Sequence, residues 1–328
     1  MGIATIEEKG TMAMRGIPTA DLSVVIVSWN VADLLVKCLE SLIADAKGLS
    51  LEVFIVDNAS KDDTLNKLRQ FPQFRVIANE VNVGFAQANN QVFKDVTGRF
   101  VLILNPDTVV IEGALRKMIE FLVNHPDVGM VGPRLCYPND EVQATCARPF
   151  ITLAMSLFYA PRLLQLPFVG RWLSKQYLFP YDLSISQCVE AISGAAMMIR
   201  REIIQKLGGF GDTFLHGGED LDLCFRIQKS GWKTYYLSDA KIIHFEGQSA
   251  KQVSVRTVVN TVLSTQEYFN RCYGTWHGVM YRLIAQFVQA PTLISVSLVK
   301  WLLRRESSHE LQQRIAMAKA IWVWQKVS

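Results

Sequence analysis

The chain has 328 residues, of which 50% are hydrophobic and 20% charged, so it can bury a large core in one big α/β domain or in a domain with an appendage. Its net charge of +4 is too small to indicate nucleic-acid binding. The same mild positive charge is compatible with an anionic membrane surface or with a phosphorylated substrate.

Six cysteines lie far apart, without CxxC or CxH spacing, which predicts buried reduced thiols and neither a zinc site nor a disulfide framework. Residues 1–20 are expected to form a loosely held tail. This tail carries Glu7, Glu8 and Lys9 and no apolar run, so we expect no signal peptide.

The first half of the chain alternates apolar runs with amphipathic segments. We expect buried strands at 22–27, 51–56, 75–78 and 100–104, with helices between them. This β-α-β-α-β-α-β order predicts an α/β fold with a mostly parallel sheet and right-handed crossovers.

Polar residues stand where three of these strands end: Asn30, Asp57 and Asn105 with Asp107. Ligands of an open parallel sheet bind outside the carboxyl ends of its strands, so this clustering predicts a nucleotide-sized ligand. Neither GxGxxG after the first strand nor GxxxxGK[ST] occurs, which disfavours a dehydrogenase and a P-loop ATPase.

Two positions in this half have a structural and a functional interpretation of about equal weight. Asp107, on the turn with Pro106, suits a hard divalent cation, or it belongs to a turn that closes the strand. Gly84 fits close approach of a ligand, or a tight entry into a helix.

The second half is predicted to add a helix at 113–124 and strands at 128–132, 142–147, 189–199, 233–237 and 241–244. Within the long strand, Ser193, Gly194 and Ala195 would let a ligand or a backbone come close. Residues 150–181 form a helical insertion that packs on the domain, or a basic apolar surface for a lipid-phosphate acceptor.

A second polar cluster is Gly217-Gly218-Glu219-Asp220-Leu221-Asp222 at a helix start. Complementing the helix dipole explains Asp222 well. It explains Glu219 and Asp220 less well, and a carboxylate after two glycines can act as a general base. His244, at the end of the last strand, is a structural histidine or a metal ligand, with similar weight.

The C-terminal region, 251–328, is predicted to be helical. Between Arg282 and Lys300 it carries no charge, which is marginal for a membrane-spanning helix. Lys300 and Trp301 at its end favour a helix lying on a membrane surface, with a helix packed on the domain as the alternative.

Taken in order, the motifs resemble the family 2 glycosyltransferases of GT-A fold, and within them the rhamnosyltransferase-like branch. The resemblance covers about residues 22–250. The motifs are Val25–Asn30, Val56–Ser60, Asn82–Ala86, Leu104–Asp107, Ser193–Ala195 and Gly218–Leu223.

The resemblance implies roles for single residues. Asp107 and His244 would hold Mg²⁺ or Mn²⁺, although Asn105 stands where the family often has a first Asp. Asp220 would be the catalytic base, and Asp57 would bind the base or ribose of the nucleotide. The remaining substrate-binding positions are expected to be Ser28, Asn30, Asn82, Gly84, Asn105, Gly194 and Glu219.

We therefore expect an inverting, metal-dependent glycosyltransferase that uses a dTDP- or UDP-sugar, dTDP-L-rhamnose first, and a glycan or polyprenyl-diphosphate-linked acceptor. It would act in the cytoplasm at the inner face of the plasma membrane; whether it forms a homo-oligomer stays open. The alternatives are a sugar nucleotidyltransferase, for which Ser28-Trp29-Asn30 lacks a basic triphosphate loop, and a non-catalytic nucleotide-sugar-binding protein.

Overall fold

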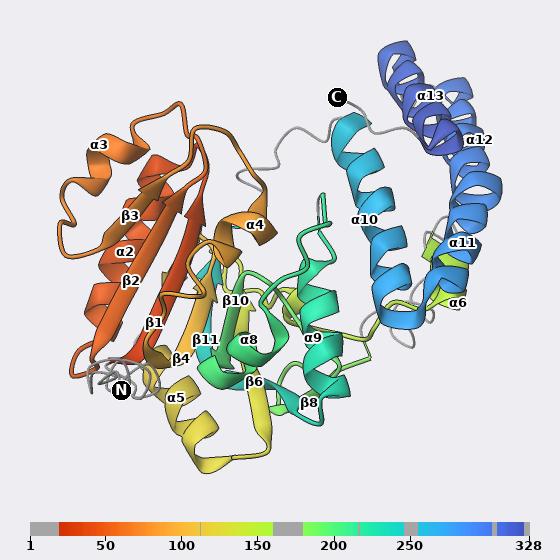
Figure 1. The fold of residues 1–328 in the computed structure, drawn as a ribbon. Helices are drawn as coiled ribbons and strands as arrows, with labels where there is room; N and C mark the ends of the chain where they lie inside the picture. The colour runs from red at the N-terminus through yellow and green to blue at the C-terminus, as the bar shows by residue number, and fades with distance from the viewer. Residues whose placement is uncertain are drawn as a thin grey trace, which may run out of the picture.

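The computed structural model describes residues 20–111, 113–159, 180–215, 217–245, 255–303 and 307–324. Within them, nine strands form one twisted sheet, which Figure 1 shows at the centre of the molecule. The sheet order is β3 (Arg75–Ala78), β2 (Leu51–Asp57), β1 (Ala20–Ser28), β4 (Gly98–Leu104), β10 (Ala196–Arg200), β6 (Val128–Cys136), β11 (Lys233–His244) and β5 (Thr108–Val110), with β8 (Gln187–Val189) paired to β11.

The first four strands of this order run parallel, as the alternation of strands and helices predicts. β10 is antiparallel to both of its neighbours, whereas β11 runs parallel to β6. The expected fold, a mostly parallel sheet flanked by helices, is confirmed.

Helices cover both faces of the sheet: α2 lies behind it in Figure 1 and α8 in front. Each buries an apolar stripe; α2, for example, buries Leu35, Cys38, Leu39 and Leu42. The helices of this part are α2 (Ala32–Asp45), α3 (Thr64–Leu68), α4 (Phe85–Asn90), α5 (Ala114–Asn124), α6 (Leu153–Tyr159), α8 (Arg201–Leu207) and α9 (Glu219–Lys229).

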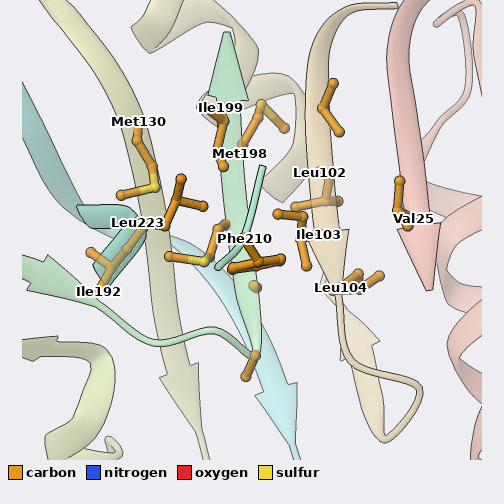
Figure 2. Packing of buried hydrophobic residues seen from close by; sticks show 14 of the residues in the cluster. Val25, Leu102, Ile103, Leu104, Met130, Ile192, Met198, Ile199, Phe210 and Leu223 are labelled. Carbon is orange, nitrogen blue, oxygen red and sulfur yellow. The ribbon is translucent and has the colours of Figure 1, made fainter. Parts of the chain in front are cut away.

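The core lies against the central strands, where side chains from both faces are excluded from water. Figure 2 shows Leu102, Ile103 and Leu104 of β4 packing beside Met198 and Ile199 of β10. These residues are fully buried, which explains why the sequence of a central strand is an unbroken apolar run.

Two expected strands are interrupted. Residues 142–147 form an isolated bridge at Val142, a 3₁₀ turn, η2 (Ala144–Cys146), and the short strand β7 (Ala147–Arg148), because the Cys146 N–H bonds back to Gln143 O. The segment 189–199 is divided among β8, β9 (Ala191–Ile192) and β10. It breaks at Glu190, whose N–H donates to the hydroxyl of Tyr181, and again at Ser193–Ala195.

In contrast, the strands expected at 233–237 and 241–244 are one continuous strand, β11. Its pairing with β6 shifts register between Leu237 and Lys241, so the polar residues between the two expected strands belong to an irregularity within one strand.

The C-terminal helices lie at the end of the molecule away from β3 (Figure 1). They are α10 (Val255–Tyr273), α11 (Thr275–Ile284), the π-helical η5 (Ala285–Gln289), α12 (Ala290–Leu302) and α13 (Ser308–Val323). α11, η5 and α12 form one helix of 28 residues, the one helix in the described part of the chain that is long and apolar enough to cross a membrane. Only 22% of its most apolar window is buried.

The structure does not test the domain boundaries that the sequence predicts. Residues 1–19, which hold most of the expected tail, and residues 246–254, which hold the expected boundary between residues 250 and 251, lie outside the described residues. Of the insertion expected at 150–181, residues 160–179 also lie outside them, whereas α6 is a helix that contacts the C-terminal helices through Ser156 O and the amide of Gln289.

Candidate active site

The polar residues that follow β1, β2 and β4 meet at one edge of the sheet. The three strands are adjacent and parallel, with Ser28 opposite Asp57 and Ile26 opposite Leu104. Because their carboxyl ends are level, the loops that carry Asn30, Asp57 and Asn105 lie side by side, as expected from the sequence.

Two buried polar atoms at this edge have no hydrogen-bond partner within the described structure. They are Ser28 Oγ, on a fully buried residue, and Asp57 Oδ1, on a residue that is 2% exposed. The other oxygen of Asp57 accepts from the Ser60 N–H at 3.2 Å. A buried polar atom without a partner is costly, so such a pair at a strand edge fits a ligand that supplies the missing hydrogen bonds.

Side-chain amides hold the loops around this pair. Asn30, in a left-handed conformation with φ 53°, accepts the Lys61 N–H at 2.7 Å, which joins the loops after β1 and β2. Asn58, 2% exposed, donates to Asn82 Oδ1 at 2.9 Å and accepts the Val83 N–H at 3.0 Å. The oxygens of Asn30 and Asn82 therefore organise the loops.

Gly84 ends this loop network and begins α4. Its N–H donates to Asn82 Oδ1, and its φ of 86° requires glycine. No atom lies within 4 Å of the place where a Cβ would stand. Both interpretations of Gly84 from the sequence, helix entry and an open approach for a ligand, are compatible with this geometry.

The turn after β4 is fastened from three sides. Asn105 N donates to Ala195 O at 2.9 Å, and Thr108 Oγ1 donates to Asn105 O at 2.7 Å. Below the turn lies the thiol of Cys38, whose pKa burial raises to about 12, so it stays neutral. The hydrogen bond that closes the turn therefore comes from Thr108, and the carboxylate of Asp107 is not needed for it.

Asp107 and His244 meet because β5 and β11 pair. His244 stands opposite Thr108 in this antiparallel pair, and Phe245 N donates to Asp107 O at 2.9 Å. Both residues are at most 7% exposed, and His244 Nε2 lies 3.4 Å from Asp107 Oδ1. The structure therefore brings together the two residues that were expected to hold a metal.

This pair fits a divalent cation whose other ligands come from a substrate. No third acidic, imidazole or thiol group joins Asp107 and His244 among the residues that the structure describes. Mg²⁺ is commonly bound through one or two protein carboxylates together with phosphate oxygens and water. One carboxylate and one imidazole match this requirement, and an imidazole also suits Mn²⁺.

Behind His244 lies Gln143, a fully buried residue just before η2. His244 Nδ1 is 2.9 Å from Gln143 Oε1, and Gln143 Nε2 donates to His244 O at 2.8 Å. The ring of His244 is thus held from the side opposite Asp107.

Asp220 stands in the first turn of α9 and points toward the loop between β9 and β10. Its Oδ2 accepts from Gly194 N at 3.2 Å and forms an ion pair with Arg148 of β7. A Cβ on Gly194 would lie 3.3 Å from Asp220 Cβ, so glycine permits the approach. The side chain of Asp220 stays 16% exposed, so its carboxylate can be reached from solvent.

Glu219, beside Asp220, has an unusual electrostatic setting. Its Oε2 is buried without a hydrogen-bond partner in the described structure. Burial, followed by the charge of Asp220, raises the pKa of Glu219 to about 7. Near neutral pH this carboxyl group therefore holds a proton for part of the time.

Asp222, interpreted from the sequence as a partner of the helix dipole, has a larger role. It is fully buried and binds Arg226 at 2.8 Å and Arg271 of α10 at 2.9 Å. α10 also holds the loop before α9, since Ser264 Oγ accepts from Leu215 N at 2.9 Å. The C-terminal region is therefore anchored directly to the helix that carries Asp220.

A short bridge joins the His244 and Asp220 parts of the edge. Gln143, which contacts His244, and Arg148, which contacts Asp220, are five residues apart, a separation of at most about 18 Å in an extended chain and less across a 3₁₀ turn. On the other side, Ala195 O binds the Asn105 turn while Gly194 N binds Asp220. These two sets of contacts connect Asp220 to the edge of the sheet at which Asp107 and His244 meet.

The sequence analysis missed Gln143, Arg148 and Asn58 as members of this site. Asn58 follows Asp57 directly and was recognisable as part of that motif. Gln143 and Arg148 carry no comparable signal, because their partners are about 100 and 72 residues away in the sequence.

The fold and this edge define the class of the protein: an α/β enzyme of the GT-A glycosyltransferase type. Consistent with this, the model of the family Glycosyl transferase family 2 matches residues 23–208, more than half of the chain. The chain belongs to this family and is a glycosyltransferase.

Known relatives and solved structures resemble this chain at low identity. The O-antigen biosynthesis protein RfbC of Myxococcus xanthus is 24% identical over 76% of the chain, but the match spans only 19% of that protein. An N-acetylglucosaminyl-diphospho-decaprenol L-rhamnosyltransferase of Mycobacterium tuberculosis is 24% identical over 70% of this chain and 77% of its own.

Among solved structures, the mannosyltransferase PcManGT of Pyrobaculum calidifontis, in complex with GDP-Man and Mn²⁺, superposes with a TM-score of 0.55. It is 16% identical and covers 95% of this chain, which itself covers 90% of PcManGT. At this identity the likeness supports the fold.

Proposed function

We propose that this glycosyltransferase moves L-rhamnose from dTDP-L-rhamnose to a lipid-linked glycan acceptor, with inversion at the anomeric carbon. The observation that carries the proposal is the grouping of Asp107, His244 and Asp220 around one edge of the sheet. The name of the mycobacterial relative supports rhamnose as the sugar and a polyprenyl diphosphate as the carrier.

The nucleotide is assigned to the edge formed by β1 and β2. Asp57 Oδ1 and Ser28 Oγ are buried and have no hydrogen-bond partner among the described residues, and the base or ribose of a nucleotide would supply N–H and O–H groups to them. We assign Asn30, Asn82 and Gly84 to the walls of this subsite, because their backbone and amide bonds fix the two loops.

Asp107 and His244 would hold Mg²⁺ or Mn²⁺ at the diphosphate. When bound there, such a cation neutralises the negative charge that grows on the leaving nucleoside diphosphate. Asn105 and Gly194 lie on the turns that flank this position, so we assign them to the sugar–diphosphate path.

Asp220 would take the proton of the acceptor hydroxyl. As this proton moves to the carboxylate, the hydroxyl oxygen bonds to the anomeric carbon and the bond to the nucleoside diphosphate breaks, so no sugar becomes attached to the protein. General-base assistance of this kind is worth about 10²–10⁴-fold in rate. Arg148 and Gly194 keep the carboxylate oriented, and Glu219 shapes its electrostatic surroundings.

The acceptor would reach the site from a membrane surface on the cytoplasmic side. The α11–α12 helix exposes large apolar side chains that include Trp276 at 70%, Phe287 at 62% and Leu302 at 65%. Lys300, near its end, suits anionic lipid headgroups. α10 packs against α11 and is anchored to α9 through Asp222, so these helices are connected to the helix that carries Asp220.

A donor panel tests the proposal. Purified protein with Mn²⁺ is given dTDP-L-rhamnose, UDP-N-acetylglucosamine and GDP-mannose in turn, and release of nucleoside diphosphate is followed with and without a polyprenyl-diphosphate-linked acceptor. We expect acceptor-dependent release from dTDP-L-rhamnose to exceed the others at least tenfold. Preference for another donor would refute the sugar assignment, and absence of release from every donor would refute the transferase role of this site.

A further inference from the structure

The backbone N–H and the side-chain amide of Gln143 all form contacts within the protein. Its backbone N–H donates to Leu135 O at 2.9 Å, its side-chain amide donates to His244 O at 2.8 Å, and its amide oxygen lies 2.9 Å from His244 Nδ1. The residue is fully buried, so no water competes for these bonds. Two contacts to a single residue indicate that the side chain serves that residue.

The hydrogen bonds determine which way the amide faces. A backbone carbonyl can only accept, so the amide nitrogen must be the atom at His244 O. The amide oxygen then faces the imidazole ring, and because this oxygen also only accepts, Nδ1 must carry the proton. A neutral imidazole has one N–H, so Nε2 keeps its lone pair.

That lone pair points at Asp107. The distance from Nε2 to Asp107 Oδ1 is 3.4 Å, longer than the 2.7–3.2 Å usual for an N–H donor and an oxygen. The opposite tautomer would place a donor here and close the pair with a hydrogen bond. With Nε2 unprotonated, an imidazole nitrogen and a carboxylate oxygen face each other as two electron-pair donors.

We infer that Gln143 is a positioning residue that holds His244 as the Nδ1–H tautomer, with Nε2 unprotonated and directed at Asp107. The tautomer follows from the contacts of Gln143 alone, whereas its use for a divalent cation rests on the proposed function. Outer partners that orient a metal-binding histidine in this way typically change metal affinity 10–100-fold when they are removed.

The tautomer is tested on the metal-free full-length protein. The chain has five histidines, so the ¹⁵N spectrum of protein labelled at histidine is simple, and His244→Gln identifies the signals of His244. At about pH 8.5, where an ordinary imidazole is neutral, we expect His244 to show the Nδ1–H pattern. An Nε2–H pattern in the unmodified protein would overturn the inference without any variant.

Two substitutions at Gln143 and one control substitution distinguish a specific effect on His244 from a general effect on the fold. Gln143→Leu removes both contacts, so we expect a mixture of tautomers. Gln143→Glu keeps an acceptor at Nδ1 and should keep the Nδ1–H form. Gln228→Leu is the matched control, because it also removes two amide contacts to backbone carbonyls, those of Val189 and Glu190, without touching His244.

Mn²⁺ binding, followed by electron paramagnetic resonance, provides the second readout. We expect Gln143→Leu to weaken Mn²⁺ binding at least tenfold while Gln228→Leu changes it less than threefold. Unchanged tautomer and unchanged Mn²⁺ affinity in a folded Gln143→Leu protein would refute the positioning role. If the unmodified protein shows the Nδ1–H pattern but binds no Mn²⁺, the proposed cation is wrong while the tautomer assignment stands.

Discussion

The site has a buried side, formed by Ser28, Asp57, Asp107 and His244, and an open side, formed by Asp220 in the first turn of α9. Residues of the buried side are at most 7% exposed, and strand pairing fixes most of them. On the open side, the side chain of Asp220 is 16% exposed, and two glycines with positive φ, Gly217 and Gly218, precede the carboxylates.

This difference in exposure suits two functions, binding of the charged donor and proton transfer from the acceptor. Buried oxygen and nitrogen atoms bind a charged ligand strongly because water does not screen them. A general base has to meet a substrate that arrives from solution, so it needs exposure and a defined orientation. We therefore expect substitutions on the buried side to weaken donor binding, and substitutions on the open side to slow transfer while donor binding persists.

The largest effect is expected for Asp220→Asn. The amide keeps the shape of the carboxylate but cannot take the proton, so kcat should fall about 10²–10⁴-fold. The Kd for the donor, measured by calorimetry, should change less than threefold. Asp212→Asn, at an exposed position of the preceding loop, is the control and should leave both values unchanged. Near-normal turnover of Asp220→Asn would remove this residue from the base role.

On the buried side, Asp107→Ala should weaken Mn²⁺-dependent binding of the donor by tenfold or more, about 1.4 kcal/mol. The reason is loss of the carboxylate that faces His244 Nε2. Calorimetry with and without Mn²⁺ separates this effect from binding of the nucleotide itself. Equal donor affinity of the variant and the unmodified protein in Mn²⁺ would contradict the assignment of the ligand.

The surface of α11–α12 that we propose as a membrane contact should respond to charge. In the double variant Trp276→Glu/Phe287→Glu, two exposed aromatic side chains become carboxylates. The variant can no longer bury these rings in the headgroup region, and anionic lipid repels its new charges. Flotation with phosphatidylglycerol vesicles should show at least a tenfold loss of bound protein. Equal flotation of the variant, or no flotation of the unmodified protein, would exclude this surface as a membrane contact.

Arg148→Met is expected to affect catalysis and not donor binding, because Arg148 orients Asp220 and does not belong to the buried side. We expect kcat to fall about tenfold, a smaller loss than for Asp220→Asn, while the Kd of the donor stays within threefold. Arg148→Lys keeps the charge and should recover part of the rate. A change in donor affinity larger than the change in kcat would place Arg148 at the donor instead.

The smallest effect concerns stability. The pKa of Glu219 is about 7 in the folded chain against an ordinary 4.5, so unfolding releases its proton between these values and stability falls as pH rises. Glu219→Gln removes this penalty, which should stabilise the protein at pH 8 by on the order of 1–2 kcal/mol relative to pH 4.5.

Urea unfolding at both pH values measures this difference. Glu202→Gln, at an exposed carboxylate in the first turn of α8, is the control and should show no pH-dependent gain. An equal gain for Glu219→Gln at pH 4.5 and pH 8 would show that the carboxyl group does not titrate in this window.

The sequence predicts residues on both sides of the site, but not the contacts that connect the two sides. The apolar runs of β1, β2 and β4 identify the strands, and parallel pairing then places Asp57 and Asp107 at one edge. The motif order further suggested Asp220 and His244. Local patterns and the rule that ligands bind at strand ends placed Asp57 and Asp107, whereas the roles predicted for Asp220 and His244 came from the resemblance to family 2 glycosyltransferases.

The connections between the two sides were not predictable in this way. Residues 142–147 have the composition of a strand, yet the contact of Gln143 with His244 depends on a partner far along the chain. Asp222 likewise fits a helix-dipole pattern locally, whereas its second partner, Arg271, comes from α10. Tertiary contacts between polar side chains leave no periodic trace in a sequence.

The most direct test of the account is a crystal structure of the protein with Mn²⁺ and dTDP, in which the anomalous signal locates the cation. We predict Mn²⁺ bound directly to a carboxylate oxygen of Asp107 and to His244 Nε2, with the diphosphate between this pair and Asp220. A cation bound elsewhere, or a diphosphate on a face of the sheet that Asp220 does not reach, would contradict it.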